Sequence, residues 1–127
     1  MKIIATIARI LLGLVFVVFG LNIFLHFIPN PPPPPGPAGD FSKALFVSHY
    51  LHVVGALQVI GGLILLSGRF VPFGLLLLGP VIVNILLFHA LLAPSGLPLA
   101  IIVSVLALIV LWQYRAAFAG VVKDHRV

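Results

Sequence analysis

Residues 79–94, GPVIVNILLFHALLAP, are apolar almost throughout and yet contain a proline, an asparagine and a histidine. Inside a bilayer an amide or an imidazole is costly, so such a side chain usually faces protein or a wet cavity. On a straight helix Asn84 lies about 40° around the axis from Pro80, and His89 lies about 140° from Asn84 and roughly 7.5 Å further along. The stretch therefore predicts a membrane-spanning helix that carries polar side chains among neighbouring helices.

The composition of the whole chain is that of an integral membrane protein. Of the 127 residues, 62% are hydrophobic and only 7% are charged, which is far from the averages of soluble domains. The formal net charge of +5 does not indicate nucleic-acid binding, because the basic residues are scattered between apolar runs and form no stripe. The absence of cysteine excludes disulfides, thiolate metal sites and iron–sulfur ligation within this chain. The expected surroundings are a lipid bilayer.

Four long apolar runs predict an all-α fold, a polytopic membrane protein whose four transmembrane helices form an up-and-down bundle. Each run is close to the roughly 20 residues that a bilayer requires. We expect a single membrane domain over residues 1–127. Its predicted spans are 3–28, 44–66, 73–93 and 99–119, and its one long connection is 29–43. Because this connection is rich in proline, which disrupts both helices and sheets, it is expected to be an extended polyproline-like strap.

The basic residues predict how the bundle is oriented. With four spans, both termini and the turn at 67–72 share one side of the membrane. That side holds six of the seven basic residues, namely Lys2, Arg9, Arg69, Arg115, Lys123 and Arg126. The opposite side holds only Lys43, so the positive-inside rule predicts that both termini are cytoplasmic. Arg9 lies about two turns into the first span, and its side chain is expected to reach back to the near interface.

This orientation gathers polar side chains at the outer end of the bundle, beneath the strap. The candidate cofactor-binding residues are Asn22, His26, His49, His52, Asn84 and His89. Three interpretations are open. The histidines could be interfacial residues satisfied by carbonyls or water, they could hold the carbonyls of a quinone head group, or they could ligate a metal or a haem. Asp40 is the only acidic residue on this side, which weighs against a di-iron site.

A second polar position lies deeper in the same helix as His52. Gly55, Gln58 and Gly62 fall with His52 within an arc of roughly 120°. Small residues allow close approach of helices, and an amide can form a hydrogen bond between them. We interpret this arc, Gln58 included, as a helix-packing face.

The chain lacks the residues of a self-sufficient catalytic site. No serine lies in a nucleophile elbow, no pair of acids is available for general acid–base chemistry, and no phosphate-binding loop is present. Neutral histidine exchanges protons near neutral pH. The chemistry that this inventory best supports is proton-coupled redox on a lipid-soluble carrier, with the electrons supplied from elsewhere.

Four pieces of sequence, taken in order, resemble the DoxX family of small four-span bacterial membrane proteins. They are residues 8–16 with 20–22, residues 55–62, residues 68–72 and residues 80–89. The resemblance implies a four-helix bundle in the bacterial cytoplasmic (inner) membrane. It also implies association with oxidoreductase systems, because the family is named alongside the membrane subunit of a thiosulfate:quinone oxidoreductase. Gln58 departs from the pattern, since an acidic residue is expected there in many relatives.

The leading hypothesis is a small DoxX-like subunit that supports a membrane redox complex and contacts quinone through the outer histidines and asparagines. The alternative is a purely structural accessory subunit without a cofactor, which packs against larger membrane proteins. Copies of the chain itself are also possible partners. A channel or transporter is disfavoured, because four short helices leave little room for a pore unless several copies assemble.

Overall fold

The computed structural model describes residues 2–29 and 32–124. Within these ranges the chain is almost entirely helical and contains no strand. The elements, in chain order, are α1 (Lys2–Leu25), α2 (Pro37–Val47), α3 (Tyr50–Ser67), α4 (Val71–Leu91), the short 3₁₀ turn η1 (Pro94–Gly96), α5 (Leu97–Gln113) and α6 (Arg115–Phe118). The predicted all-α fold is confirmed.

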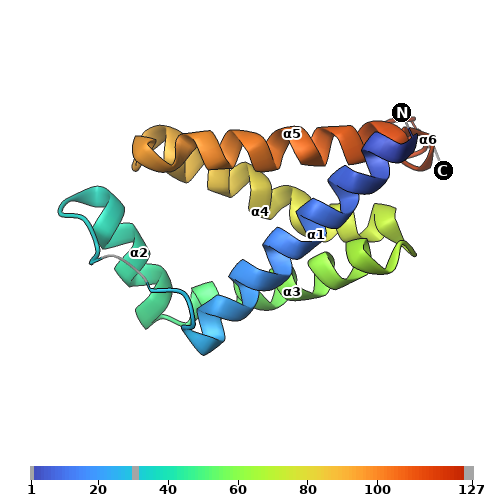
Figure 1. The fold of residues 1–127 in the computed structure, drawn as a ribbon. Coiled ribbons are helices and arrows are strands. Elements are labelled where there is room, and N and C mark those ends of the chain that lie inside the picture. The colour runs from blue at the N-terminus through green and yellow to red at the C-terminus, as the bar shows by residue number, and fades with distance from the viewer. Residues whose placement is uncertain (1, 30–31, 125–127) are drawn as a thin grey trace.

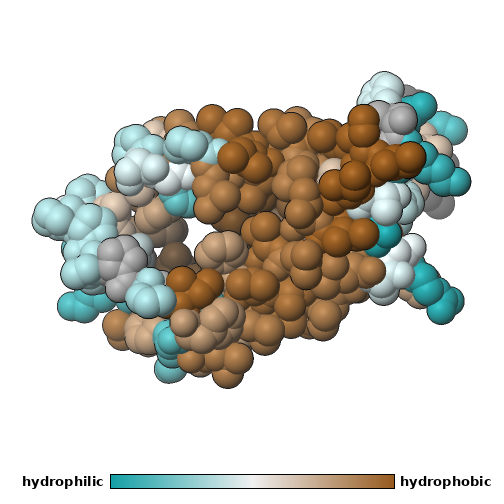
Figure 2. Space-filling view, in the orientation of Figure 1, coloured by the Kyte–Doolittle hydropathy of each residue, from teal (hydrophilic) through white to brown (hydrophobic). Residues whose placement is uncertain are grey.

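Four helical segments of the described chain are long and apolar enough to cross a membrane: α1, α3, α4, and α5 together with η1. α1 packs against α3, α3 against α4, α4 against α5, and α5 back against α1, so the four form a closed up-and-down bundle (Figure 1). The start of α1, the α3–α4 turn and α6 lie at one end, called the terminal end below. α2 lies at the other, which we call the α2 end. Figure 2 shows a hydrophobic band between two more hydrophilic ends, as expected for a membrane protein.

The tightly packed core occupies the half of the bundle nearest the terminal end. Its most deeply buried side chains are Leu12, Leu65, Val71, Leu78 and Val110. These come from all four long helices and pack into one cluster. Toward the α2 end the α1–α3 pair and the α4–α5 pair separate (Figure 1), and the protein is hollowed there instead of filled.

Glycines allow α1 and α3 to approach closely at two levels. A Cβ atom added at Gly62 would lie 2.8 Å from the carbonyl oxygen of Gly13, and one added at Gly20 would lie 3.0 Å from that of Gly55. Such distances leave no space for a side chain, so the two backbones nearly touch. Gly55 and Gly62 of the predicted packing face therefore do pack closely against α1.

The connection between the first two spans differs from the predicted strap. Residues 32–36 are non-helical, as expected, but α2 begins immediately afterwards at Pro37. Proline is tolerated in the first turn of a helix, because its missing N–H would have no partner there. Gly36 supplies the left-handed turn, with φ of 89°, that leads into the helix.

The second span begins later than predicted, because α2 extends beyond residue 43. Its start was predicted at residue 44, but residues 44–47 belong to α2, and α3 begins at Tyr50. Between the two helices His49 adopts a left-handed backbone conformation with φ of 63°. The chain therefore turns at His49 before it enters the bundle.

Arg9 extends toward the terminal end of the bundle, the side that the sequence-based expectation gave it, and meets α3 beside the α3–α4 turn. Its guanidinium donates hydrogen bonds to the carbonyls of Leu65 and Leu66, in the last turn of α3. Carbonyls at a helix end have no partner within the helix, and a cation there also interacts favourably with the helix dipole. Arg9 thus closes the end of α3 from the neighbouring helix.

Candidate ligand-binding site

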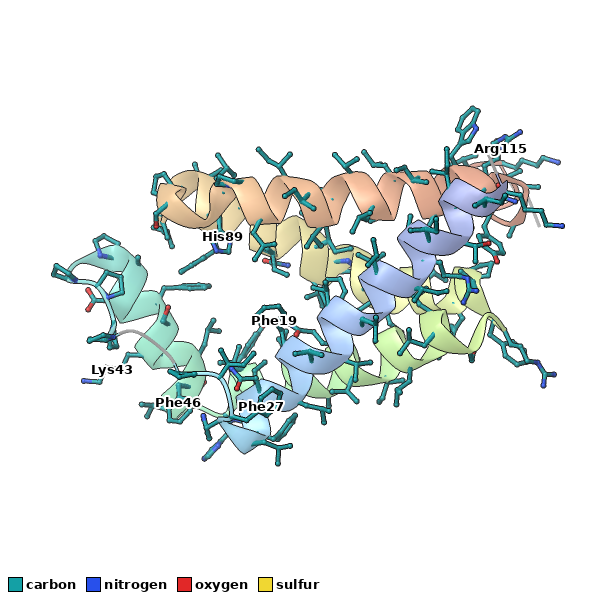
Figure 3. The ribbon with its side chains drawn as sticks, in the orientation of Figure 1. Phe19, Phe27, Lys43, Phe46, His89 and Arg115 are labelled. Carbon is teal, nitrogen blue, oxygen red and sulfur yellow. The ribbon has the colours of Figure 1, made fainter. Side chains whose placement is uncertain are left out.

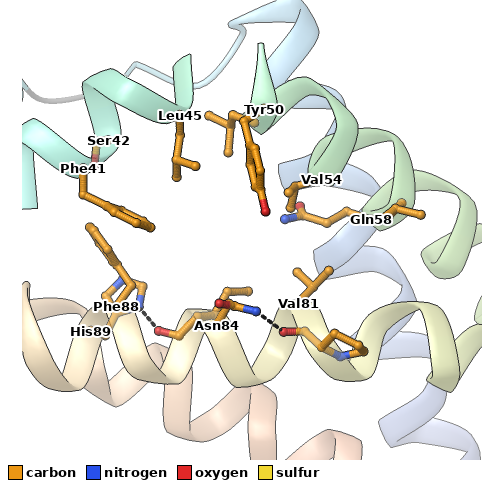
Figure 4. Close-up of a pocket in the computed structure, with 14 residues that line it drawn as sticks. Phe41, Ser42, Leu45, Tyr50, Val54, Gln58, Val81, Asn84, Phe88 and His89 are labelled. Atoms are coloured by element: carbon orange, nitrogen blue, oxygen red, sulfur yellow. Dashed lines mark hydrogen bonds between the residues drawn. The ribbon is translucent and has the colours of Figure 1, made fainter. Parts of the chain in front are cut away.

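A cavity of about 690 Å³ lies between α2, α3 and α4 at the α2 end (Figure 4). Figure 2 shows an opening in the surface at this end, between α2 and the hydrophobic body of the bundle. The side chains around the cavity are Phe41, Ser42, Leu45, Tyr50, Leu51, Val54, Leu57, Gln58, Pro80, Val81, Asn84, Ile85, Phe88 and His89. A mostly apolar cavity with a few polar groups is the usual form of a small-molecule site. We call it the large cavity.

Gln58 is the most deeply buried polar side chain of the large cavity. Only 8% of it is exposed. No hydrogen bond joins its side-chain amide to any part of the chain that the structure describes. The amide atoms are open to the cavity, whereas the enclosed side-chain atom without a partner in that part of the chain is His52 Nδ1. Figure 4 shows this amide at the cavity wall, with the Tyr50 hydroxyl pointing into the cavity beside it. Because this amide faces the cavity and has no partner in the described chain, Gln58 is suited to bind a molecule inside the cavity.

Asn84 and His89 face the large cavity from α4, and each uses one polar atom within its own helix. The Asn84 Nδ2 donates to the Pro80 carbonyl at 2.8 Å, and the His89 Nδ1 lies 2.8 Å from the Ile85 carbonyl (Figure 4). A carbonyl only accepts, so Nδ1 carries the proton, and Nε2 of the neutral ring is an acceptor. The Asn84 Oδ1 and the His89 Nε2 remain for other partners.

The His89 ring is held in place by the turn that follows α4. A Cβ atom added at Gly96 would lie 2.3 Å from the His89 Cδ2 and 2.6 Å from its Nε2. The ring therefore fits against the bare backbone of η1. Glycine at position 96 allows His89 to keep its hydrogen bond to Ile85.

Two phenylalanines bridge the large cavity between α2 and α4. The rings of Phe41 and Phe88 lie 5.7 Å apart between centroids (Figure 4). This distance is within the range of favourable aromatic pairs. The pair links the outer helix α2 to the bundle across the cavity.

A second cavity, of about 280 Å³, lies beside the first at the α2 end. Its lining side chains are Phe19, Asn22, Ile23, His26, Phe46, Leu51 and Gln58. Leu51 and Gln58 line both cavities and form the wall between them. We call this one the small cavity. Asn22 is 7% exposed, and its Oδ1 accepts a hydrogen bond from the Ile28 backbone N–H at 2.7 Å.

His49 and His52 line neither cavity. The ring of His52 lies 5.1 Å from that of His49, 5.4 Å from that of Phe24 and 5.8 Å from that of Phe46, between centroids. Phe46 also contacts the ring of His26, at 6.1 Å. Figure 3 shows Phe46 and Phe27 at the α2 end, while Lys43 projects away from the bundle. An aromatic cluster thus joins α1, α2 and α3, and it consists of the rings of Phe24, His26, Phe46, His49 and His52.

The six side chains predicted from the sequence thus occupy three places and not one. Asn84 and His89 line the large cavity, Asn22 and His26 line the small one, and His49 and His52 belong to the aromatic cluster. Among the described residues, no group of three or more His, Cys, Asp or Glu side chains could hold a metal ion.

The sequence interpretation missed several side chains that shape the large cavity. Gln58 was assigned to packing, and Tyr50, Phe41 and Phe88 were not singled out. The signal for Gln58 was present, because a lone amide in an apolar helix is expensive wherever it lies. The aromatic residues gave no such signal, since α2 was not foreseen.

A model of the DoxX family matches residues 4–91. The chain belongs to the DoxX family. The match runs from α1 to the last residue of α4 and includes every residue that lines the two cavities of this DoxX protein. The comparisons with curated proteins and with solved structures gave no match.

Proposed function

We propose that this DoxX protein is a small membrane subunit of a redox complex and that it holds the head group of a quinone in the large cavity. The observation that carries the proposal is the buried, unpartnered amide of Gln58 in the wall of that cavity. Its N–H groups are suited to donate to a quinone carbonyl.

The dimensions and lining of the large cavity support a lipid-soluble ligand. Its volume of about 690 Å³ lies within the usual range for small-molecule sites. Apolar side chains such as Leu45, Val54 and Ile85 fit the ring and the start of an isoprenoid tail. The Tyr50 hydroxyl and the two α4 side chains, Asn84 and His89, provide further hydrogen-bonding atoms around the head group.

A bound quinone supplies two-electron, two-proton redox chemistry, and this chain would bind and orient it. The Gln58 amide and the Tyr50 hydroxyl are placed to fix the head group from α3. His89 would line the site from α4, with its ring held between the Ile85 carbonyl and the backbone of η1. The Phe41–Phe88 pair would restrict access of water and lipid to the ring. We propose that a partner subunit exchanges the electrons, in keeping with the oxidoreductase systems that the family resemblance implies.

We also propose that the chain lies in the bacterial cytoplasmic membrane with both termini in the cytoplasm. The support is the distribution of basic residues, which gather at the terminal end. Arg115 lies at this end (Figure 3) and its guanidinium is 4.3 Å from the centre of the Trp112 ring. Such a pair of an aromatic and a cationic residue is typical of a membrane interface.

The proposal is tested by measuring quinone binding to the purified protein in nanodiscs. Gln58→Leu keeps the approximate volume and removes the amide, so quinone affinity should fall about tenfold, the effect of one lost hydrogen bond. His89→Ala should weaken binding in the same direction. Gln113→Leu is the matched control, because Gln113 is exposed at the end of α5 and lines neither cavity.

Native mass spectrometry of the extracted protein gives an independent readout. A quinone should add a defined mass to the 13.6 kDa chain and be lost from Gln58→Leu. Equal quinone affinity in the wild type, Gln58→Leu and His89→Ala, all folded, would contradict the assignment. A chain that retains only other polypeptides would favour the structural accessory subunit instead.

A further inference from the structure

The small cavity is polar for its depth in the bundle. Three of its seven lining residues, Asn22, His26 and Gln58, carry hydrogen-bonding side chains. It begins at the α2 end, where His26 is exposed and Phe46 is 48% exposed. It ends at Gln58, which forms part of the wall of the large cavity. The polar side chains therefore run from the protein surface to the proposed ligand site.

Two amide side chains in this cavity carry N–H groups that have no acceptor among the described residues. The Asn22 Oδ1 is engaged by the Ile28 N–H, but no acceptor for its Nδ2 exists among the described residues. The Gln58 amide has no hydrogen-bond partner in that part of the chain, and Gln58 lines both cavities. A cavity admits water when it is roomy and offers several polar partners. At about 280 Å³, the small cavity has space for a chain of several water molecules.

We propose that the small cavity is a water-filled passage from the α2 end to the Gln58 amide. Asn22 and Gln58 hold the water by hydrogen bonds, and His26 lies at the mouth. The hydration follows from these side chains alone. Its use rests on the proposed function, because a quinone head group must exchange protons with water when its redox state changes. The passage would supply that exchange without opening the large cavity.

The absence of cysteine in the chain allows a direct test by single-cysteine labelling of the full-length protein in nanodiscs. A thiol reacts with a charged, water-soluble thiosulfonate only where water reaches it, because the thiolate is the nucleophile. Phe19→Cys places a thiol on the small cavity. Val18→Cys is the matched control, since Val18 is one residue away, is 38% exposed against 44% for Phe19, and lines neither cavity.

We expect Phe19→Cys to react at least about tenfold faster than Val18→Cys. Adding Gln58→Leu should slow the Phe19→Cys reaction severalfold, because one of the two amides that hold the water is lost. Equal, slow reaction of both thiols would overturn the passage. A fast Phe19→Cys reaction that Gln58→Leu leaves unchanged would also overturn the passage. It would show that loss of the Phe19 ring admits the reagent, whether or not Gln58 holds water there.

A second pair of variants covers the case in which Phe19→Cys does not fold. Ile23→Cys faces the small cavity, and Leu21→Cys, on the same helix, faces neither cavity. The same difference in rate is expected for this pair. Because labelling needs no quinone, it can succeed where quinone binding fails, and the two proposals are distinguishable.

Discussion

At the scale of single residues, Arg9 shows how a buried charge can serve the fold. Its guanidinium is partly buried and donates to the carbonyls of Leu65 and Leu66 at the end of α3. Within a bilayer these carbonyls have no solvent to replace the lost donor. We predict that Arg9→Leu lowers the free energy of unfolding by about 2 kcal/mol, the typical effect of a hydrogen bond to a charged group. Equilibrium unfolding in mixed micelles measures the change.

The control for this prediction is Arg69→Leu. Arg69 is exposed in the α3–α4 turn and interacts with the Phe70 ring at 5.8 Å. Its removal should change the stability by less than about 0.5 kcal/mol, as for most exposed positions. If both variants lost the same free energy of unfolding, the positive charge at the terminal end would be the stabilising factor, and not the hydrogen bonds from Arg9 to the end of α3.

Arg9 also shows which side-chain roles cannot be predicted from the sequence. Arg9 could be placed in the first span, but the carbonyls that it contacts lie 56 residues away along the chain. Gln58 was recognised as a polar residue on a glycine-rich face, and its amide was expected to form a hydrogen bond to a neighbouring helix. The face is indeed packed against α1 at Gly55 and Gly62, and the Gln58 Cβ itself lies against Gly20, while the amide reaches the side of α3 where α3 and α4 separate. Helix periodicity predicts which side chains share a face but not where two helices diverge.

At the scale of the helices, the closest approach is that of α1 and α3. The levels Gly13–Gly62 and Gly20–Gly55 are each seven residues apart on their helix, which is two turns, so the two antiparallel contacts fall on one stripe of each helix. We predict that Gly62→Ala destabilises the protein by about 1–3 kcal/mol, since its Cβ would meet the Gly13 carbonyl oxygen at 2.8 Å and backbone cannot yield as a side chain can.

Gly79→Ala is the matched control for the helix contact. A Cβ atom at Gly79, within α4, would meet nothing within 4 Å. Because alanine favours a helix over glycine, this variant should be neutral or more stable by about 0.5–1 kcal/mol. The same unfolding measurement applies to both variants. Destabilisation of similar size in the two would indicate a general need for glycine and contradict the close-contact explanation.

Helix α2 was the element that the sequence did not predict. Proline was taken to exclude a helix over 29–43, but the exclusion applies to the helix interior and not to its first turn, where Pro37 lies. The four long helices were predictable because each is a sustained apolar run. α2 is short, is less hydrophobic than the four long helices, and depends for its position on aromatic contacts such as Phe41 with Phe88. Such long-range contacts carry no local signature in the chain.

At the scale of the whole molecule, two ends of different charge imply a fixed orientation in the membrane. The two ends of the bundle offer a matched pair of exposed serines, Ser67 as the last residue of α3 and Ser95 in η1. Each can be replaced by cysteine in a chain that has none. The positive-inside rule places Ser67 in the cytoplasm and Ser95 outside it.

We therefore predict that a membrane-impermeant maleimide labels Ser95→Cys in intact cells and labels Ser67→Cys only after the membrane is opened. The difference should be close to all-or-none, because each turn lies wholly on one side of the bundle. Labelling of Ser67→Cys alone in intact cells would reverse the orientation and place α2 and both cavities at the cytoplasmic face. Labelling of both would indicate two coexisting orientations. Only the predicted result lets the small cavity open toward the outer side, where its water would exchange protons with the space outside the cell membrane.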